Sequence, residues 1–431
     1  MNWEASPSRL ETNITGKERL LPIAGVLRDL RLAARNLLRN RQRTLVAVGT
    51  VAFGIVAFLL AGGFIQFIFH DMRETTIHSQ LGHIQIVRPG YFDKGIADPY
   101  AFLLPGQSPE QKVVEKTTGF ASLAPRLAFS GLISHDEATI AFVGEGVDPE
   151  REERLSSSLT LVEGRKLASA TERAAILGEG LARSLGVHPG DQVILLATAA
   201  TGSASAVEVT VAGIFATTSQ EYDERALRIP ITVARKLMKV SGATAWVILL
   251  DKTEDTVAAA SHLASSLDAK NFEVVPWTAL ADFYNKTVVL FSKQVSVVKF
   301  IIGLLIVLTI SNTQMMCVLE RTTEIGTSLA IGRRGHDVMM LFLTEGALVG
   351  LLGGVVGVVV GYTLATLISA IGIPMPPPPG MAHGFIGQIL VSPSLAFDAF
   401  SLAVLTTLVA SVIPAWKASR MSIVDALRHN Q

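Results

Sequence analysis

The sequence predicts an α-helical membrane protein with four transmembrane helices, arranged one plus three, and a large external α+β domain made of two subdomains, one inserted in the other. Hydrophobic residues make up 49% of the 431 residues and charged residues only 17%, whereas soluble chains carry about a quarter charged residues. The apolar residues are concentrated in four runs, and residues 70–295, of mixed composition, separate the first run from the second. The alternative, a soluble protein that buries four such helices, has too little charge to cover its surface.

The charge balance and the cysteine count exclude several classes of protein. Thirty-seven Lys and Arg residues balance thirty-seven Asp and Glu residues, so no nucleic-acid partner is expected. The apolar content excludes a disordered chain. Cys317 is the single cysteine, so an internal disulfide or a cysteine-based metal cluster is excluded, and Cys317 is interpreted as a small apolar packing residue.

The four apolar runs are long enough to cross a bilayer. Residues 45–69 carry no charge over 25 positions, about 37 Å as a helix, against a hydrocarbon core of about 30 Å. A cleaved signal peptide would be shorter and nearer the N-terminus, so this run is expected to be retained. The other three predicted spans are 296–319, 338–371 and 395–416.

Basic residues predict the orientation, because Lys and Arg mark the cytoplasmic side. The amphipathic segment 1–44 is rich in arginine, segment 320–337 holds three arginines and the tail 417–431 holds three more basic residues, whereas loop 372–394 has none. Both termini and segment 320–337 are therefore expected in the cytoplasm, and residues 70–295 and loop 372–394 outside. The proline run in that loop predicts a stiff polyproline segment, either a rigid linker or a brace.

The external domain shows alternating strand and helix signals. The order of the predicted strands and helices fits a split βαβ sandwich, with a second small unit inserted at about 150–240. The predicted elements are strand 83–87, helix 109–117 capped by Ser108, strands 123–134 and 138–147, strand 246–250, helix 255–267 and strand 272–275. In the insert they are segment 177–185, a turn at 187–191 and strand 207–211.

The sequence contains no signature of an enzyme. A P-loop, an H-E-x-x-H zinc motif and a G-x-S-x-G elbow are all absent from it, so no cofactor is expected on this chain. His78 and His83 form the closest histidine pair and are interpreted as a solvated strand edge. A proton-coupled carrier is the alternative suggested by Lys299, Glu345 and Asp398, but such a relay needs several facing groups at mid-depth.

The third predicted span carries glycines at four-residue spacing. Such rows let another helix approach closely, within the chain or from a partner. The alternative is the general glycine richness of membrane helices. The two rows are Gly346, Gly350 and Gly354, and Gly353, Gly357 and Gly361.

The segment between the second and third spans predicts a short amphipathic helix. Ile325, Leu329 and Gly332 share one face, and charged residues occupy the rest. Such a helix either docks into a groove on a soluble partner or lies among the lipid headgroups. The candidate contact residues are Glu320, Arg321, Glu324, Ile325, Gly326, Leu329, Gly332, Arg333 and Arg334.

At this segment the chain resembles the permease family of MacB, FtsX, LolC and LolE, the mechanotransmission (type VII) ABC transporters. Ile423 stands where the family commonly has proline, which is one departure. The matching segments are ERTTEIG at 320–326, AIGRR at 330–334, LTEGA at 343–347, PAWKASR at 414–420, VDALR at 424–428, the entry helix at 35–44, and 177–179, 186–191 and 211–215 in the external domain.

The resemblance implies a multi-pass protein of the bacterial inner membrane that exports or extracts a lipid-linked or hydrophobic substrate, such as a lipoprotein. Its implied partners are two copies of an ABC ATPase, which binds ATP and Mg²⁺ and docks on 320–337, a second permease chain in a homodimer or heterodimer, membrane lipids, and a periplasmic adaptor or lipoprotein carrier. The 44 residues before the first span leave no room for an ATPase domain, so it is expected on a separate chain. The alternative is an FtsX-like subunit that regulates a periplasmic enzyme without transport.

Overall fold

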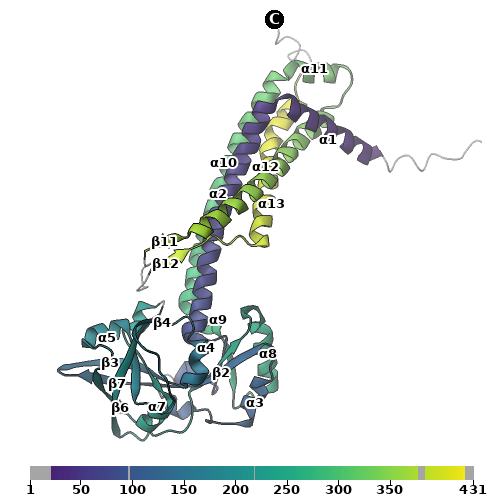
Figure 1. The fold of residues 1–431 in the computed structure, drawn as a ribbon. Helices are drawn as coiled ribbons and strands as arrows, with labels where there is room; N and C mark the ends of the chain where they lie inside the picture. The colour runs from purple at the N-terminus through teal and green to yellow at the C-terminus, as the bar shows by residue number, and fades with distance from the viewer. Residues whose placement is uncertain (1–20, 96–97, 218, 377–383, 423–431) are drawn as a thin grey trace, which may run out of the picture. The chain divides into compact units, whose positions relative to one another are not determined.

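The computed structural model describes residues 21–95, 98–217, 219–376 and 384–422. The chain divides into a helical unit, with residues up to 66, 292–371 and from 388 onward, and an α/β unit, with residues 67–291 and 372–387 (Figure 1). Part of the proline run and the VDALR motif at 424–428 lie outside the described residues.

Four helices of the described chain are long and apolar enough to cross a membrane. Each of the four predicted spans falls within one of them, and the helices extend past the predicted ends because charged residues continue the helical pattern beyond the apolar run. The helices of this part of the chain are α1 (Leu21–Arg39), α2 (Arg41–Thr76), α10 (Asp282–Glu320), α11 (Thr322–Ala330), α12 (Gly335–Ile371) and α13 (Pro393–Ser419). Of these, α2, α10, α12 and α13 are the candidate spans.

The core of the helical unit is made of aliphatic side chains from α2, α10, α12 and α13. Val51, Ile55 and Leu59 of α2 are fully buried at four-residue spacing, and Ile306 and Ile310 of α10 pack in the same cluster. This spacing places one stripe of each helix against its neighbours, as expected for packed membrane helices.

The α/β unit is built on one ten-stranded sheet in the order β10-β1-β9-β2-β3-β8-β5-β7-β4, with β6 paired to β2 and β7. A separate pair, β11 (Ile373–Met375) and β12 (Phe385–Gly387), belongs to the same unit. The strands are β1 (Ile84–Val87), β2 (Phe120–His135), β3 (Ala138–Val147), β4 (Thr160–Gly164), β5 (Ala174–Gly178), β6 (Gln192–Thr198), β7 (Ala204–Ala216), β8 (Ala226–Pro230), β9 (Ala245–Leu250) and β10 (Glu273–Pro276).

The first lobe of this unit has the predicted split βαβ arrangement. Strands β10, β1, β9 and β2 pair antiparallel in that order. Helices α3 (Pro109–Glu115) and α8 (Thr256–Ser266) contribute Val114 and Leu263 to one core with Trp246 of β9. The predicted cap of α3 is wrong in one respect, because the Ser108 side chain makes no capping hydrogen bond.

The second lobe is a closed ring of strands. The pairings β2–β3, β3–β8, β8–β5, β5–β7, β7–β6 and β6–β2 return to their starting strand. Strand β2 is therefore shared by the two lobes: its residues 120–126 pair with β9 and its residues 127–135 pair with β3. The segment predicted at 177–185 is the end of β5 followed by α5 (Glu179–Leu185).

Short helices complete the α/β unit around these strands. They are η1 (Ile77–Leu81), η2 (Tyr91–Gly95), η3 (Pro99–Phe102), α4 (Pro149–Leu155), α6 (Gln220–Asp223), α7 (Ile231–Met238), η4 (Thr253–Asp255) and α9 (Trp277–Leu280).

Candidate functional site

The segment between α10 and α12 forms a compact helix–turn connection. Helix α10 ends at Glu320, α11 begins at Thr322 and α12 begins at Gly335. Gly332 adopts a left-handed backbone with φ of 98°, which a glycine reaches without steric cost. The Asp337 carboxylate accepts a hydrogen bond from the Arg334 N–H at 3.3 Å, so the first turn of α12 is partly capped.

The apolar face of α11 packs inside the helical unit. Ile325 is 7% exposed and lies in a cluster with Val318 of α10, Val338 and Phe342 of α12, and Ala415 of α13. Gly326 is also buried, and Leu329 is half-buried against the same cluster. This face therefore contacts neighbouring helices rather than a partner groove or lipid headgroups.

Ion pairs connect α11 and the end of α10 to α1 and α2. Arg39 Nη2 donates to both carboxylate oxygens of Glu324, at 2.9 and 3.0 Å. Arg43 binds both oxygens of Glu320 through its two terminal nitrogens. The hydrogen bond from Arg39 lowers the pKa of Glu324; partial burial opposes this and Arg321 adds to it. Glu324 is therefore charged at neutral pH.

Glu345 forms a second set of contacts at this end of the unit. It is buried in α12 and accepts hydrogen bonds from Asn36 Nδ2 at 2.7 Å and from Arg321 Nη1 at 3.1 Å. Arg321 also donates to Glu324 at 3.2 Å. Residues from α1, α11 and α12 thus share one polar network, and Glu345 has an amide and a guanidinium as partners rather than another acid or a base to exchange a proton with.

The remaining surface of the segment is exposed. Ile331 is 83% exposed, and Thr327, Ala330, Arg334 and His336 are also exposed. These five residues, which we call the outer face of the connection, lie at the end of α11 and the start of α12. Of the predicted contact residues, Ile325 and Gly326 are buried, and Glu320, Arg321 and Glu324 are engaged within the chain.

The two glycine rows of α12 pack against two different helices. A Cβ on Gly354 would lie 3.0 Å from Phe400 of α13. A Cβ on Gly357 would lie 2.7 Å from Cβ of Ile55 in α2. The first row (Gly346, Gly350, Gly354) contacts α13, through Ser411, Thr407 and Phe400, and the second row (Gly353, Gly357, Gly361) contacts α2, through Val51, Ile55 and Leu59. Both close approaches are therefore made within the chain.

Two buried arginines of the α/β unit were not predicted from the sequence. Arg228 of β8 is 1% exposed and donates to Glu145 at 2.9 Å, to Ser156 Oγ at 2.9 Å and to the carbonyl of Ser79 at 2.8 Å. Arg126 of β2 bonds Glu152 and the carbonyl of Gln80. Ser79 and Gln80 belong to η1, which follows α2 directly, so these arginines fasten the end of that helix to the sheet.

The Glu145 carboxylate of this cluster is held in the ionised form. Burial alone would raise the pKa of Glu145, but Arg126 and Arg228 outweigh that effect and hold it below its usual range. Burial, and then the Glu145 charge, raise the pKa of Tyr222, whose hydroxyl donates to Glu145 at 3.3 Å. A cluster of this kind was invisible to sequence reasoning because its members are spread from residue 79 to residue 228.

The interpretation of the histidine pair as a solvated strand edge is wrong for His83, which is 1% exposed. The rings of His78 and His83 lie edge to face, 5.8 Å apart. His83 Nδ1 accepts from the N–H of Leu250 at 3.1 Å and its Nε2 lies 3.0 Å from Thr253 Oγ1. Burial, and then the charge of His78, lower the pKa of His83 to about 4, so it is neutral at pH 7. Across the described residues, no three His, Cys, Asp or Glu side chains gather closely enough to hold a metal.

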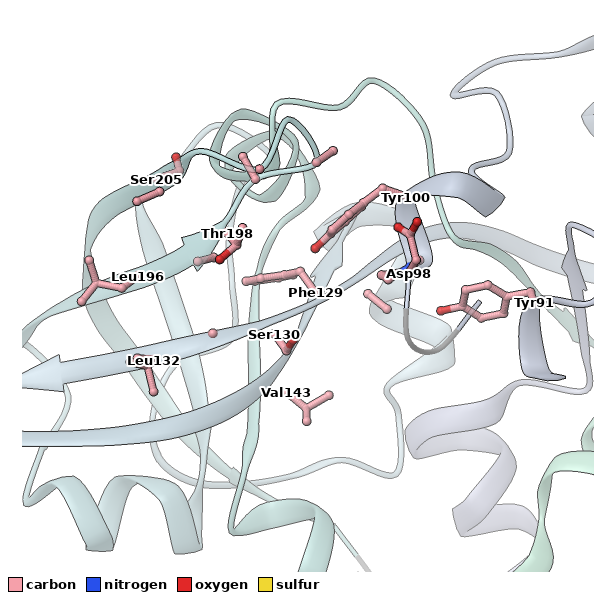
Figure 2. Close-up of a pocket in the computed structure, with 18 residues that line it drawn as sticks. Tyr91, Asp98, Tyr100, Phe129, Ser130, Leu132, Val143, Leu196, Thr198 and Ser205 are labelled. Atoms are coloured by element: carbon pink, nitrogen blue, oxygen red, sulfur yellow. The ribbon is translucent and has the colours of Figure 1, made fainter. Parts of the chain in front are cut away.

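A pocket of about 850 Å³ opens where β2 and β6 separate. The two strands pair only over residues 132–134 and 194–196. Figure 2 shows Tyr91, Asp98 and Tyr100 on one side, facing the strand residues that include Ser130 and Thr198. Burial raises the pKa of Tyr100 to about 12, so its hydroxyl stays protonated. The described lining residues are mainly small, apolar or hydroxyl-bearing side chains, with Asp98 as the acidic one.

Two family models match the chain. The model described as the MacB-like periplasmic core domain matches residues 44–266, which is half of the chain. The model described as the FtsX-like permease C-terminal domain matches residues 296–423. The first match covers nearly all of α2 and most of the α/β unit, and the second runs from within α10 to the end of α13.

Curated relatives agree with these matches. The "Macrolide export ATP-binding/permease protein MacB" of Sodalis glossinidius is 27% identical over 426 residues, 93% of this chain and 60% of the relative. The "Lipoprotein-releasing system transmembrane protein LolC" of Xylella fastidiosa is 25% identical over 335 residues, 72% of this chain and 78% of the relative. The chain thus spans about 60% of the length of that MacB relative.

Among solved structures, the periplasmic region of MacB from Actinobacillus actinomycetemcomitans is 15% identical with a TM-score of 0.34, covering 47% of this chain and 93% of that one. The extracellular domain of the ABC-type transporter YknZ from Gram-positive bacteria is 12% identical with a TM-score of 0.33, covering 45% and 98%. The family-model matches confirm the resemblance found in the sequence. The chain belongs to the MacB/LolC-like family of ABC transporter permeases, with a MacB-like periplasmic core domain and an FtsX-like permease domain.

Proposed function

We propose that the chain is the transmembrane subunit of an ABC transporter in the bacterial inner membrane. Two copies of a separate ATPase, which bind ATP and Mg²⁺, drive the export or extraction of a lipid-linked or hydrophobic substrate such as a lipoprotein. Both termini and α11 face the cytoplasm, as the arginine distribution favours, and the α/β unit lies in the periplasm. A second permease chain, identical or related, completes the transporter, and a periplasmic adaptor or lipoprotein carrier receives the substrate.

The observation that carries this proposal is the way α11 is held. Its apolar face packs on α10, α12 and α13, and its charges bind α1 and the buried Glu345 network. A helix fixed on its inner side moves together with the helices that hold it. Its outer face, with Ile331 and Arg334, is free to receive a soluble partner.

The proposed mechanism is mechanical. Closure of the ATPase dimer displaces α11, and the ion pairs pass this displacement to α1 and α2 as well as to the covalently continuous α10 and α12. The glycine contacts leave little space between α12 and its neighbours α2 and α13, so the helices move together. Helices α2 and α10 lead into the α/β unit, where Arg126 and Arg228 bind the carbonyls of η1.

The outer face of the connection can be tested by charge substitution. We expect Ile331→Asp combined with Arg334→Glu to weaken ATPase binding at least about tenfold, because an exposed apolar anchor and a cation are lost from the contact. The measurement is the amount of ATPase that co-purifies with the full chain and the ATPase rate of the complex in nanodiscs.

The matched control for this experiment is Ile386→Asp. Ile386 is 66% exposed in β12, so the same change is made on a surface that α11 does not form. Equal ATPase binding and stimulation by the wild type and the Ile331/Arg334 variant would refute docking at this face.

The ion pair between Arg43 and Glu320 can be tested by exchange of its charges. Both side chains are about 40% exposed, so Glu320→Arg should change the stability of the chain little. It should nevertheless lower ATPase stimulation about threefold, because α2 no longer follows the end of α10 and like charges repel. The double variant Arg43→Glu/Glu320→Arg should restore stimulation. A double variant as impaired as the single one would show that this pair carries no coupling.

A further inference from the structure

An apolar groove of about 560 Å³ runs along the helical unit between α10 and α13. Phe300 is 70% exposed and Leu405 is 61% exposed, so the walls of the groove lie on the outer surface of the helical unit. The apolar side chains that line the groove are Phe300, Leu304, Val307, Leu402, Leu405 and Val409.

Small residues form the floor of the groove and make it apolar. A Cβ on Gly303 would lie 3.4 Å from Thr406 Cγ2, so the two helices are close there and the glycine leaves space above the contact. The Thr406 hydroxyl donates to the carbonyls of Leu402 and Ala403, at 2.6 and 3.2 Å. The methyl group, and not the hydroxyl, therefore faces Gly303.

One charged side chain lines the groove, and a second of opposite sign stands one helical turn from its α13 wall. Lys299 lines the groove and directly precedes the charge-free run 300–319, so it stands at the edge of the hydrocarbon region. Its Nζ lies 5.9 Å from the ring centroid of Phe58, and no carboxylate of the described residues lies within 4.0 Å of it. Asp398 is exposed one helical turn before Leu402, which places it on the same face of α13.

We propose that this groove binds phosphatidylethanolamine, with one acyl chain between α10 and α13, the phosphate on Lys299 and the headgroup ammonium near Asp398. The two protein charges are not bonded to each other and match the two charges of a zwitterionic headgroup. An anionic lipid such as phosphatidylglycerol would satisfy Lys299 but leave Asp398 beside a negative headgroup. A helix of a second copy would have to bury both charges at this depth, which costs free energy.

The test measures phosphatidylethanolamine that stays bound to the full chain after purification from mixed phosphatidylethanolamine–phosphatidylglycerol membranes, by native mass spectrometry. Wild-type chain should retain phosphatidylethanolamine in preference to phosphatidylglycerol. Lys299→Gln should lower retention about tenfold, the loss of one charge-assisted contact. Asp398→Asn should abolish the preference over phosphatidylglycerol, and Gly303→Leu should displace the acyl chain by filling the groove. The matched control is Lys293→Gln, an exposed lysine on the same helix, which should retain lipid like the wild type.

Three results would overturn the assignment. The first is unchanged retention in both Lys299→Gln and Gly303→Leu. The second is stronger retention of phosphatidylglycerol than of phosphatidylethanolamine by the wild type. The third is efficient crosslinking between two chains through Leu405→Cys in a Cys317→Ala background, because a second copy would then occupy the groove. Lipid retention does not depend on the ATPase, so this result and a failure of the proposed function are distinguishable.

Discussion

Arg228→Met should destabilise the α/β unit by about 3–5 kcal/mol, the usual cost of removing one member of a buried ion cluster. The substitution leaves Glu145 and Glu152 with Arg126 as their remaining guanidinium partner, and it leaves the Ser79 carbonyl without its donor. The measurement is urea unfolding of the full chain in nanodiscs, followed by the fluorescence of Trp246 and Trp277, both buried in this unit. The end of α2 should also lose part of its protection from proteolysis, since η1 then keeps only its hydrogen bond from Arg126.

The matched control is Arg225→Met, three residues away. Arg225 pairs with Glu221 across an exposed helical turn, so its loss should cost less than about 0.5 kcal/mol. The difference in unfolding free energy between the wild type and Arg228→Met should decrease as the pH falls through about 4, because protonation removes the unpaired carboxylate charge. In the wild type, the lowered pKa of Glu145 stabilises the folded state at pH values where the carboxyl is ionised, and this stabilisation is lost as the pH falls through that lowered pKa. If Arg228→Met unfolds at the urea concentration of the wild type, the cluster does not hold the unit together.

Gly357→Leu should separate α12 from α2 and abolish transport-coupled ATPase stimulation. Its Cβ would lie 2.7 Å from Ile55 Cβ and 3.0 Å from the carbonyl of Ala52, so the backbone must move. Overpacking of this kind costs about 1–3 kcal/mol, and the added distance breaks the close contact of the two helices. The measurements are the thermal stability of the purified chain and the ATPase rate of its complex.

Gly49→Leu is the matched control on the partner helix. A Cβ on Gly49 meets nothing within 4 Å, so a leucine there extends into open space and should leave both measurements near wild type. Ile55→Ala should partly rescue Gly357→Leu by freeing the volume that the leucine needs. Wild-type stability and stimulation in Gly357→Leu would mean that the spacing of α2 and α12 is not needed for coupling.

These variants probe different parts of one proposed path. The outer face of the connection tests the docking of the ATPase, Arg43 and Glu320 test the transfer to α2, and Gly357 tests the stiffness of the helical unit. Arg228 tests how η1 is fastened within the α/β unit. A defect confined to one of these steps would show which contact limits the coupling.

Some features of the candidate site could be predicted from the sequence and others could not. The ERTTEIG segment identified the family and the position of the connecting helix, and its periodicity grouped Ile325 with Leu329. Periodicity could not say what that face contacts, because Val338, Phe342 and Ala415 come from other helices. The hydrogen bond between Glu345 and Asn36 could not be predicted either, because the two residues are 309 positions apart in the sequence. Likewise, the spacing of the glycines predicted close packing, but the structure decided that one row contacts α13 and the other α2.

Local sequence patterns were sufficient to predict the four membrane helices, the split βαβ lobe and the family. The lengths of the apolar runs and the alternation along strands are local properties, and a bilayer or a sheet face selects them directly. Three features became visible only in the folded chain: the inserted lobe closes into a ring through β2 and β6, Arg126 and Arg228 hold η1, and α11 is bound on its inner side. These features depend on contacts between distant residues, and a buried charge shows its role only when its partner is in place.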